Sequence, residues 1–166
     1  MLCVNIATTP LFAVDEGAFS EATRNMVASG NYITTYLDGA VRFDKPILSY
    51  WMQAVGVHLL GVTELAFRLP SLLATLFWVI AVGCFVAQND RRENAIPAAV
   101  LTSTALGILV IGRAATADAL LNLFLVLAVF DVYRFSETAS RRMIYRVYFW
   151  MALGMLTKGP VAVLIP

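Results

Sequence analysis

Charged residues, cysteine and histidine are all scarce in this 166-residue chain. Only 14% of the residues are Asp, Glu, Lys or Arg, and there are two cysteines and one histidine. The net charge is +1, so no basic field favours a nucleic-acid partner. Cys3 and Cys84 lie too far apart to indicate a metal motif or a disulfide framework, and we interpret both as packing residues. With His58 as its one histidine, the segment excludes a His-rich metal site built from its own residues.

Apolar residues dominate what remains. They make up 60% of the chain and give it a mean hydropathy of +0.75, whereas soluble domains contain about 45–50% apolar residues. They also come in blocks of roughly 16 to 20, the length needed to cross about 30 Å of hydrocarbon. We therefore predict an all-α fold, a polytopic transmembrane helical bundle. The expected spans are about 69–86, 95–111, 117–135 and 147–166, the last one incomplete.

The positions of arginine predict how these spans are oriented. Two basic loops are separated by two spans, so both lie on the same side of the membrane. They contain Arg91 and Arg92 after the first span, and Arg134, Arg141, Arg142 and Arg146 after the third. The positive-inside rule makes that side cytoplasmic. Residues 1–67 then form an outer-face loop that precedes the transmembrane helices of 68–166.

The outer-face loop carries signals for two juxtamembrane helices. Asp15 is placed to cap a helix over 16–29, and Gly30 is placed to end it. Its apolar residues form one stripe, as in a helix that lies on a membrane: Ala18, Phe19, Ala22, Met26 and Val27. A strand over 32–37 turns at Asp38 and returns over 41–43. A proline then opens a second, very apolar interfacial helix over 47–60.

Residues 2–14 are too short and too interrupted by polar residues and Pro10 to span a membrane. They also lack the charged start and small-residue cleavage site of a signal peptide. Because an outer-face segment needs a signal to cross the membrane, we expect a transmembrane helix before it. The chain is then the amino-terminal portion of a longer protein.

Two polar motifs on the outer face each have a chemical and a structural interpretation. Asp15 and Glu16 are adjacent carboxylates at a helix start, where they supply either a catalytic base or an ordinary cap followed by a first-turn acid. Lys45, in the run Phe-Asp-Lys-Pro, either binds a lipid phosphate as a point charge or anchors the helix by snorkelling. Spacing alone leaves both choices open.

Three further polar residues lie at the expected outer ends of the spans. Arg113 and Asp118 flank a short turn and can pair across it, and Lys158 precedes a Gly-Pro pair. Ionisable residues at span ends are functional candidates. Acids and cations gathered on one face indicate a site for an anionic lipid with a polar headgroup.

Four runs of residues, in order, carry a family resemblance. They are DEGAFSEATRNMVASGNYITTYLDGAVRFDKPILSYWMQA, FRLPS, GRAATADALLNLF and LTKGPVA. From about Pro10 to Pro166 the chain resembles the amino-terminal part of the ArnT-like and protein-O-mannosyltransferase-like families of GT-C glycosyltransferases. The resemblance implies a multi-pass enzyme of the cell inner membrane. Such an enzyme moves a sugar from a polyprenyl-phosphate-linked donor to a lipid, glycan or protein acceptor on the outer face.

By motif position, the resemblance also implies roles for individual residues. Asp15 is the catalytic carboxylate, Glu16 its supporting partner and Asp118 a second site carboxylate. Lys45 binds the carrier phosphate. From their places at the outer ends of the spans, independently of the resemblance, Arg113 and Lys158 are further lipid-phosphate-binding candidates.

The same resemblance bears on cofactors. Asp44 falls where some relatives place an acidic metal ligand, but the matching histidine lies beyond this chain. A phosphate leaving group does not demand a metal, so we expect no required cofactor and keep a divalent metal as the alternative. Where many relatives have Arg-Tyr after Asp-Glu, this chain has Gly17, Ala18 and Phe19, and an arginine contact there is absent.

Two other classes of function compete with the enzyme. One is a non-catalytic membrane scaffold or transporter segment, although a transporter favours interrupted helices with polar groups at the midplane, and the charges here lie at span ends. The other is an inert truncated fragment of the enzyme.

Overall fold

The computed structural model describes residues 14–166, so expectations about Cys3, Pro10 and the rest of 1–13 fall outside it. The described part is helical apart from one small hairpin, which confirms the predicted all-α class. Its elements are α1 (Val14–Ser29), β1 (Tyr36–Leu37), β2 (Ala40–Val41), α2 (Leu48–Leu60), α3 (Glu64–Asn89), the 3-10 turn η1 (Arg92–Asn94), α4 (Ala95–Thr104), α5 (Leu106–Arg113), α6 (Asp118–Thr138), α7 (Arg141–Lys158) and α8 (Val161–Leu164).

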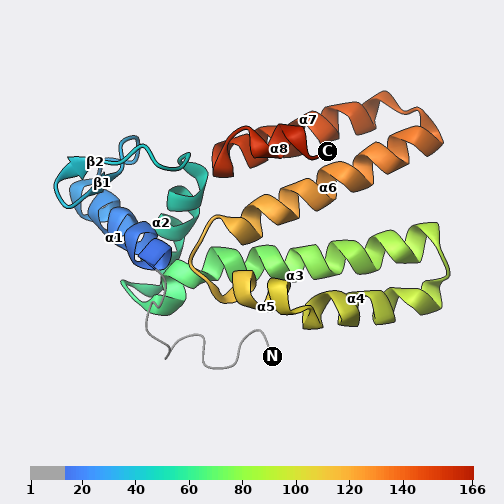
Figure 1. Cartoon of the computed structure of the whole chain (residues 1–166), viewed down its shortest axis with the longest axis horizontal. Coiled ribbons are helices and arrows are strands. Elements are labelled where there is room, and N and C mark those ends of the chain that lie inside the picture. Colours follow the sequence, from blue (N-terminus) through green and yellow to red (C-terminus); the bar gives the residue numbers. More distant parts are fainter. Residues whose placement is uncertain (1–13) are drawn as a thin grey trace.

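Figure 1 shows two parts. The long helices α3, α6 and α7 run side by side, with α4 against α3. At one end of them, where α3 and α6 begin, α1, α2 and the hairpin form a smaller unit. The helix α2 joins the two parts because it packs on α1, α3 and α7.

Within residues 14–166, two helices, α3 and α6, are long and apolar enough to cross a membrane, and α4 with α5 adds a third if the bent pair is one span. The pair is bent by 63°, whereas the sequence predicts one continuous helix over 95–111. The break lies at Ala105, whose ψ of 126° is extended. Just before it, Thr102, Ser103 and Thr104 donate side-chain hydrogen bonds to carbonyls three or four residues back. Such hydroxyls compete with the helix and bend it.

The last expected span also has different bounds. The helix α7 begins at Arg141 and ends at Lys158, and α8 follows as a separate short helix, in place of one run over 147–166. Gly159 has a φ of 82°, in the left-handed region that ends helices. The Gly-Pro pair therefore divides the segment.

In the small unit formed by α1, α2 and the hairpin, both helices end at the predicted glycines. Gly30 and Gly61 end α1 and α2 with φ near 70° and donate their N–H groups to Met26 and Val57 carbonyls. Because α1 begins at Val14, Asp15 lies inside the first turn, and the prediction that it precedes the helix as a cap was wrong.

The hairpin is shorter than the predicted strands. β1 and β2 pair antiparallel around a two-residue turn in which Asp38 and Gly39 both have positive φ. The first part of the predicted strand is instead a turn, because the Asn31 side chain accepts hydrogen bonds from the N–H groups of Ile33 and Thr34.

Protein covers the apolar stripe of α1. Phe19, Ala22 and Met26 are buried against Tyr50 of α2 and Ala117, and the Phe19 and Tyr50 rings stack with centroids 5.2 Å apart. The helix α2 behaves differently: it keeps exposed apolar residues, among them Val55 and Leu59 at its outer surface. This exposed face suits contact with lipid.

Candidate functional site

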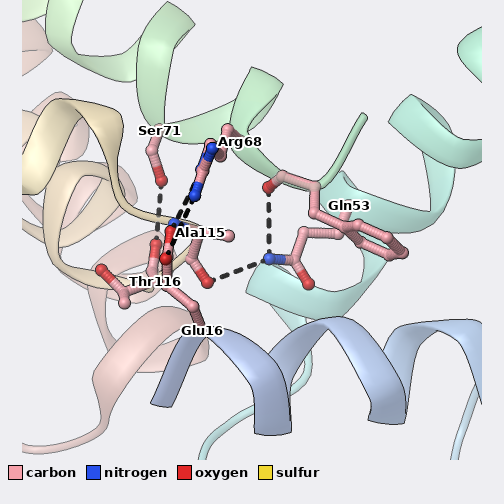
Figure 2. A network of polar contacts seen from close by, with 7 residues as sticks. Glu16, Gln53, Arg68, Ser71, Ala115 and Thr116 are labelled. Atoms are coloured by element: carbon pink, nitrogen blue, oxygen red, sulfur yellow. Dashed lines mark hydrogen bonds and ion pairs between the residues drawn. The ribbon is translucent and has the colours of Figure 1, made fainter. Parts of the chain in front are cut away.

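A buried ion pair fixes the start of α1. Arg68, near the start of α3, meets both oxygens of the Glu16 carboxylate, each at 3.3 Å (Figure 2). The Ala115 N–H also donates to Glu16, at 2.6 Å. Both charged side chains are 5% exposed, and a buried charge requires such partners. The carboxylate thereby joins α1, α3 and the turn before α6.

A second set of hydrogen bonds holds the same elements together. Gln53 of α2 donates to the carbonyls of Phe67 and Ala115, at 3.3 and 3.2 Å, and accepts from the Thr23 hydroxyl at 2.7 Å. Ser71 donates to the Thr116 carbonyl at 3.1 Å (Figure 2). Four segments distant in sequence therefore meet in one polar network with defined positions.

Asp15 stands at the edge of this network. Asp15 immediately precedes the anchored Glu16 in the first turn of α1, and unlike Glu16 it is exposed. The adjacent carboxylates are thus divided: one side chain is a buried anchor and the other is available to a ligand. Sequence spacing did not separate these two roles.

The loop before α2 holds two cations on one carboxylate. One oxygen of Asp44 accepts a hydrogen bond from Arg42 Nη2 at 2.7 Å, and the other accepts one from Lys45 Nζ at 3.3 Å. The Arg42 guanidinium, followed by the Lys45 ammonium, holds the pKa of the Asp44 carboxyl below its usual range. Although burial lowers the pKa of Arg42, its contact with Asp44 raises it overall. Asp44 and Arg42 are accordingly charged at neutral pH.

Tyr50 lies beneath this loop. It is fully buried, and burial raises the pKa of its phenol while the nearby Arg42 charge acts in the opposite direction. Because Tyr50 stacks on Phe19, the loop is linked to α1 one turn after Asp15.

The remaining predicted residues lie at the starts and ends of neighbouring helices. Asp118 begins α6 directly after the buried Ala117, and it pairs with Lys158 at the end of α7. The sequence allows Asp118 to pair with Arg113 across the turn; the structure pairs Asp118 with Lys158, and Arg113 ends α5. Ala117 packs with Tyr50, so this pair borders the small unit.

Within residues 14–166, no group of three or more His, Cys, Asp or Glu side chains is placed to hold a metal ion. Asp44, the predicted weak ligand, is instead held by Arg42 and Lys45. That transfer requires no metal stays a prediction, with a divalent metal as its alternative.

Sequence reasoning missed Arg42, Gln53 and Arg68. In the sequence, Arg68 lies directly before the predicted span 69–86. A better signal was available, because an arginine within the first turns of a hydrophobic helix needs an acidic partner. For Gln53 and Arg42 no spacing rule identifies the partner, since the contacts depend on packing.

A further unpredicted cluster lies at the other end of the long helices. Asp131 of α6 is fully buried and binds Arg134 at 3.0 Å, Arg146 of α7 at 2.9 Å and the Trp150 indole at 2.9 Å. Arg134 also donates to Gln88 of α3. The Asp131 carboxylate therefore joins α6 to α7, and Arg134 extends the cluster to α3, more than ten residues along α6 from Asp118.

Comparisons with known proteins place this geometry in context. The family model of dolichyl-phosphate-mannose-protein mannosyltransferases matches residues 44–166. The chain is 31% identical, over 95% of its length, to the undecaprenyl phosphate-alpha-4-amino-4-deoxy-L-arabinose arabinosyl transferase of Aeromonas salmonicida (strain A449), and covers 30% of that protein. It is also 30% identical to the undecaprenyl phosphate-alpha-4-amino-4-deoxy-L-arabinose arabinosyl transferase 1 of Proteus mirabilis (strain HI4320). That match covers 98% of this chain and 31% of the Proteus protein.

A solved structure is also similar. The crystal structure of ArnT from Cupriavidus metallidurans bound to undecaprenyl phosphate superposes with a TM-score of 0.91 at 23% sequence identity, over 98% of this chain and 31% of that one. The likeness shows a shared fold. The chain spans about a third of the length of these relatives.

Proposed function

Because the chain belongs to the dolichyl-phosphate-mannose-protein mannosyltransferase family, we propose that it serves transfer of a sugar from a polyprenyl-phosphate-linked donor to an acceptor on the outer face of the cell inner membrane. Asp15 is the catalytic carboxylate in this proposal, and Lys45 binds the carrier phosphate. The acceptor is a lipid, glycan or protein, and no cofactor is required.

The observation that carries the proposal is that an exposed carboxylate and a partly exposed cation belong to one small, tightly held unit. Asp15 lies in the first turn of α1, which is anchored through Glu16, and Lys45 lies in the loop before α2. The Phe19 and Tyr50 rings stack and so connect α1 with α2. Relatives whose names specify an undecaprenyl phosphate sugar donor support a phosphate-linked substrate.

These residue types suit the chemistry. Transfer breaks the bond between the anomeric carbon and a phosphate oxygen, so negative charge develops on the departing phosphate. The ammonium of Lys45 stabilises that charge. The acceptor hydroxyl loses its proton as it attacks, and a carboxylate such as Asp15 accepts it.

We propose that residues 15–67 face outside, because Arg91 and Arg92 belong to a basic loop that the positive-inside rule places in the cytoplasm. With Cys3 and Cys84 both replaced by Ser, single cysteines at Asp38 and at Asn89 test this in intact cells. An impermeant maleimide is expected to label position 38 and to reach position 89 only after permeabilisation. Labelling of position 89 with protection of position 38 reverses the orientation.

We expect Lys45→Ala to weaken binding of undecaprenyl phosphate and to slow transfer, since an ammonium is lost from both the bound and the departing phosphate. Lys45→Arg retains only part of the function, because a planar fork does not replace a compact ammonium. Affinity and turnover per folded molecule are measured for both variants.

A lysine that only anchors α2 behaves differently. Arginine then substitutes freely, and Lys45→Ala lowers the amount of protein without changing carrier affinity in the molecules that remain. Arg24→Ala is the matched control, since its side chain pairs with Glu21 on an exposed part of α1.

A further inference from the structure

We infer that Arg42 is a second ligand of the carrier phosphate, and that the Asp44 carboxylate holds the phosphate position between Arg42 and Lys45 until the carrier displaces it. The inference rests on the proposed function and adds to it a phosphate-binding residue and a competing internal anion. It concerns the loop before α2 and the buried Tyr50 beneath it.

The first argument is the way Asp44 is bound. Each of its oxygens meets a different cation, Arg42 at 2.7 Å and Lys45 at 3.3 Å. A phosphodiester also presents two free oxygens that share one negative charge, and it can be met by the same two cations. Arginine is well suited to this task because its planar fork matches phosphate geometry.

The second argument is that two buried polar atoms of this site have no partner except each other. Arg42 Nε and the Tyr50 hydroxyl are both buried, their side chains are close enough for a mutual polar contact, and neither atom has any other hydrogen-bond partner within the described residues 14–166. The guanidinium lies close enough to the phenol for its charge to act on it. Buried polar groups are almost always hydrogen-bonded, so a pair of donors without another partner indicates a place for an acceptor from outside. A phosphate oxygen is such an acceptor.

The third argument is exposure. The Arg42 side chain is 17% exposed, Lys45 31% and Asp44 44%. The two cations are thus partly shielded, whereas the carboxylate is the most open member and the one that can swing away. The three charges sum to +1, which one phosphodiester neutralises.

This arrangement predicts opposite effects for two neighbouring substitutions. Arg42→Gln removes a phosphate ligand, so we expect affinity for undecaprenyl phosphate to fall by about tenfold or more, with Arg42→Lys intermediate. Asp44→Asn removes the competing anion and leaves both cations, so we expect affinity to rise. Unfolding cannot raise affinity, so the Asp44 variant remains informative if Arg42 variants fold poorly.

The test measures binding of undecaprenyl phosphate to the chain in lipid nanodiscs, in EDTA, for the unmutated chain and for the Arg42→Gln, Arg42→Lys, Asp44→Asn, Lys45→Ala and Arg24→Gln variants. We expect Arg24→Gln to leave affinity unchanged, because Arg24 pairs with Glu21 away from the loop. Weaker binding by Arg42→Gln together with tighter binding by Asp44→Asn supports the inference.

Other outcomes overturn it in distinguishable ways. If Lys45→Ala weakens binding but Arg42→Gln does not, the Arg42 assignment fails and the proposed function stands. If Asp44→Asn binds more weakly, Asp44 supports the site and does not compete with the carrier. If the unmutated chain does not bind undecaprenyl phosphate, both the inference and the proposed carrier are overturned.

Discussion

Under the proposed function, Asp15→Asn is expected to abolish sugar transfer by the full-length protein, lowering turnover by about 10²–10⁴-fold, the usual contribution of a general base. Carrier affinity should stay nearly unchanged, because the amide keeps the size of the side chain and the phosphate ligands are elsewhere. Since Asp15 is exposed in the first turn of α1, the substitution leaves no buried group unpaired. The rate is measured with the undecaprenyl-phosphate-linked sugar that the unmutated protein transfers, alongside binding of undecaprenyl phosphate itself.

Asp38→Asn provides the matched control. Asp38 is an exposed carboxylate of the same small unit, and its positive φ suits asparagine equally well. Turnover of this control should equal that of the unmutated protein. Near-normal turnover of Asp15→Asn would remove Asp15 from the catalytic role and leave it as a first-turn acid of α1.

The largest loss of stability is expected from Arg68→Ala. It leaves the Glu16 carboxylate buried without its guanidinium, and removing one member of a buried ion pair costs about 3–5 kcal/mol. The loss should also displace the first turn of α1, because Glu16 connects that turn to Ala115 and α3. Unfolding in mixed detergent and dodecyl sulfate micelles measures the free-energy change.

A double variant separates charge from packing. Glu16→Gln combined with Arg68→Met removes both charges, so stability should recover much of what Arg68→Ala loses. Arg24→Ala, which breaks an exposed pair, should change stability by less than about 0.5 kcal/mol. If Arg68→Ala is as mild as this control, the pair does not anchor α1.

Much of the fold is predictable because the bilayer limits the alternatives. A run of apolar residues must be helical to satisfy its backbone in lipid, so the helices from Glu64 onward follow from hydropathy. The glycines at 30 and 61 likewise end α1 and α2 by a local conformational rule. The bend at Ala105 is different, since hydroxyl groups and the backbone compete there and small energies decide the outcome.

The candidate site shows a similar division. The order of the motifs along the chain predicts which segments form the site, and these motifs include Asp15, Lys45 and Asp118. The partners could not, because Glu16 meets Arg68 across 52 residues of sequence and Lys158 meets Asp118 across 40. Single-sequence patterns describe neighbours along a helix, whereas these contacts depend on how α1, α3, α6 and α7 pack.

The Asp131 cluster implies that two arginines act at two stages in the life of the protein. On the proposed topology, Arg134 and Arg146 are independent positive charges while the nascent chain is inserted, and they help to retain their loop on the cytoplasmic side, whereas acidic residues contribute little to that retention. Once α6 and α7 pack, both side chains bind one buried carboxylate, and Arg146 becomes a tether between the helices. Replacing Arg146 by Leu therefore removes one of the loop's four positive charges and, separately, one of the two cations that Asp131 binds.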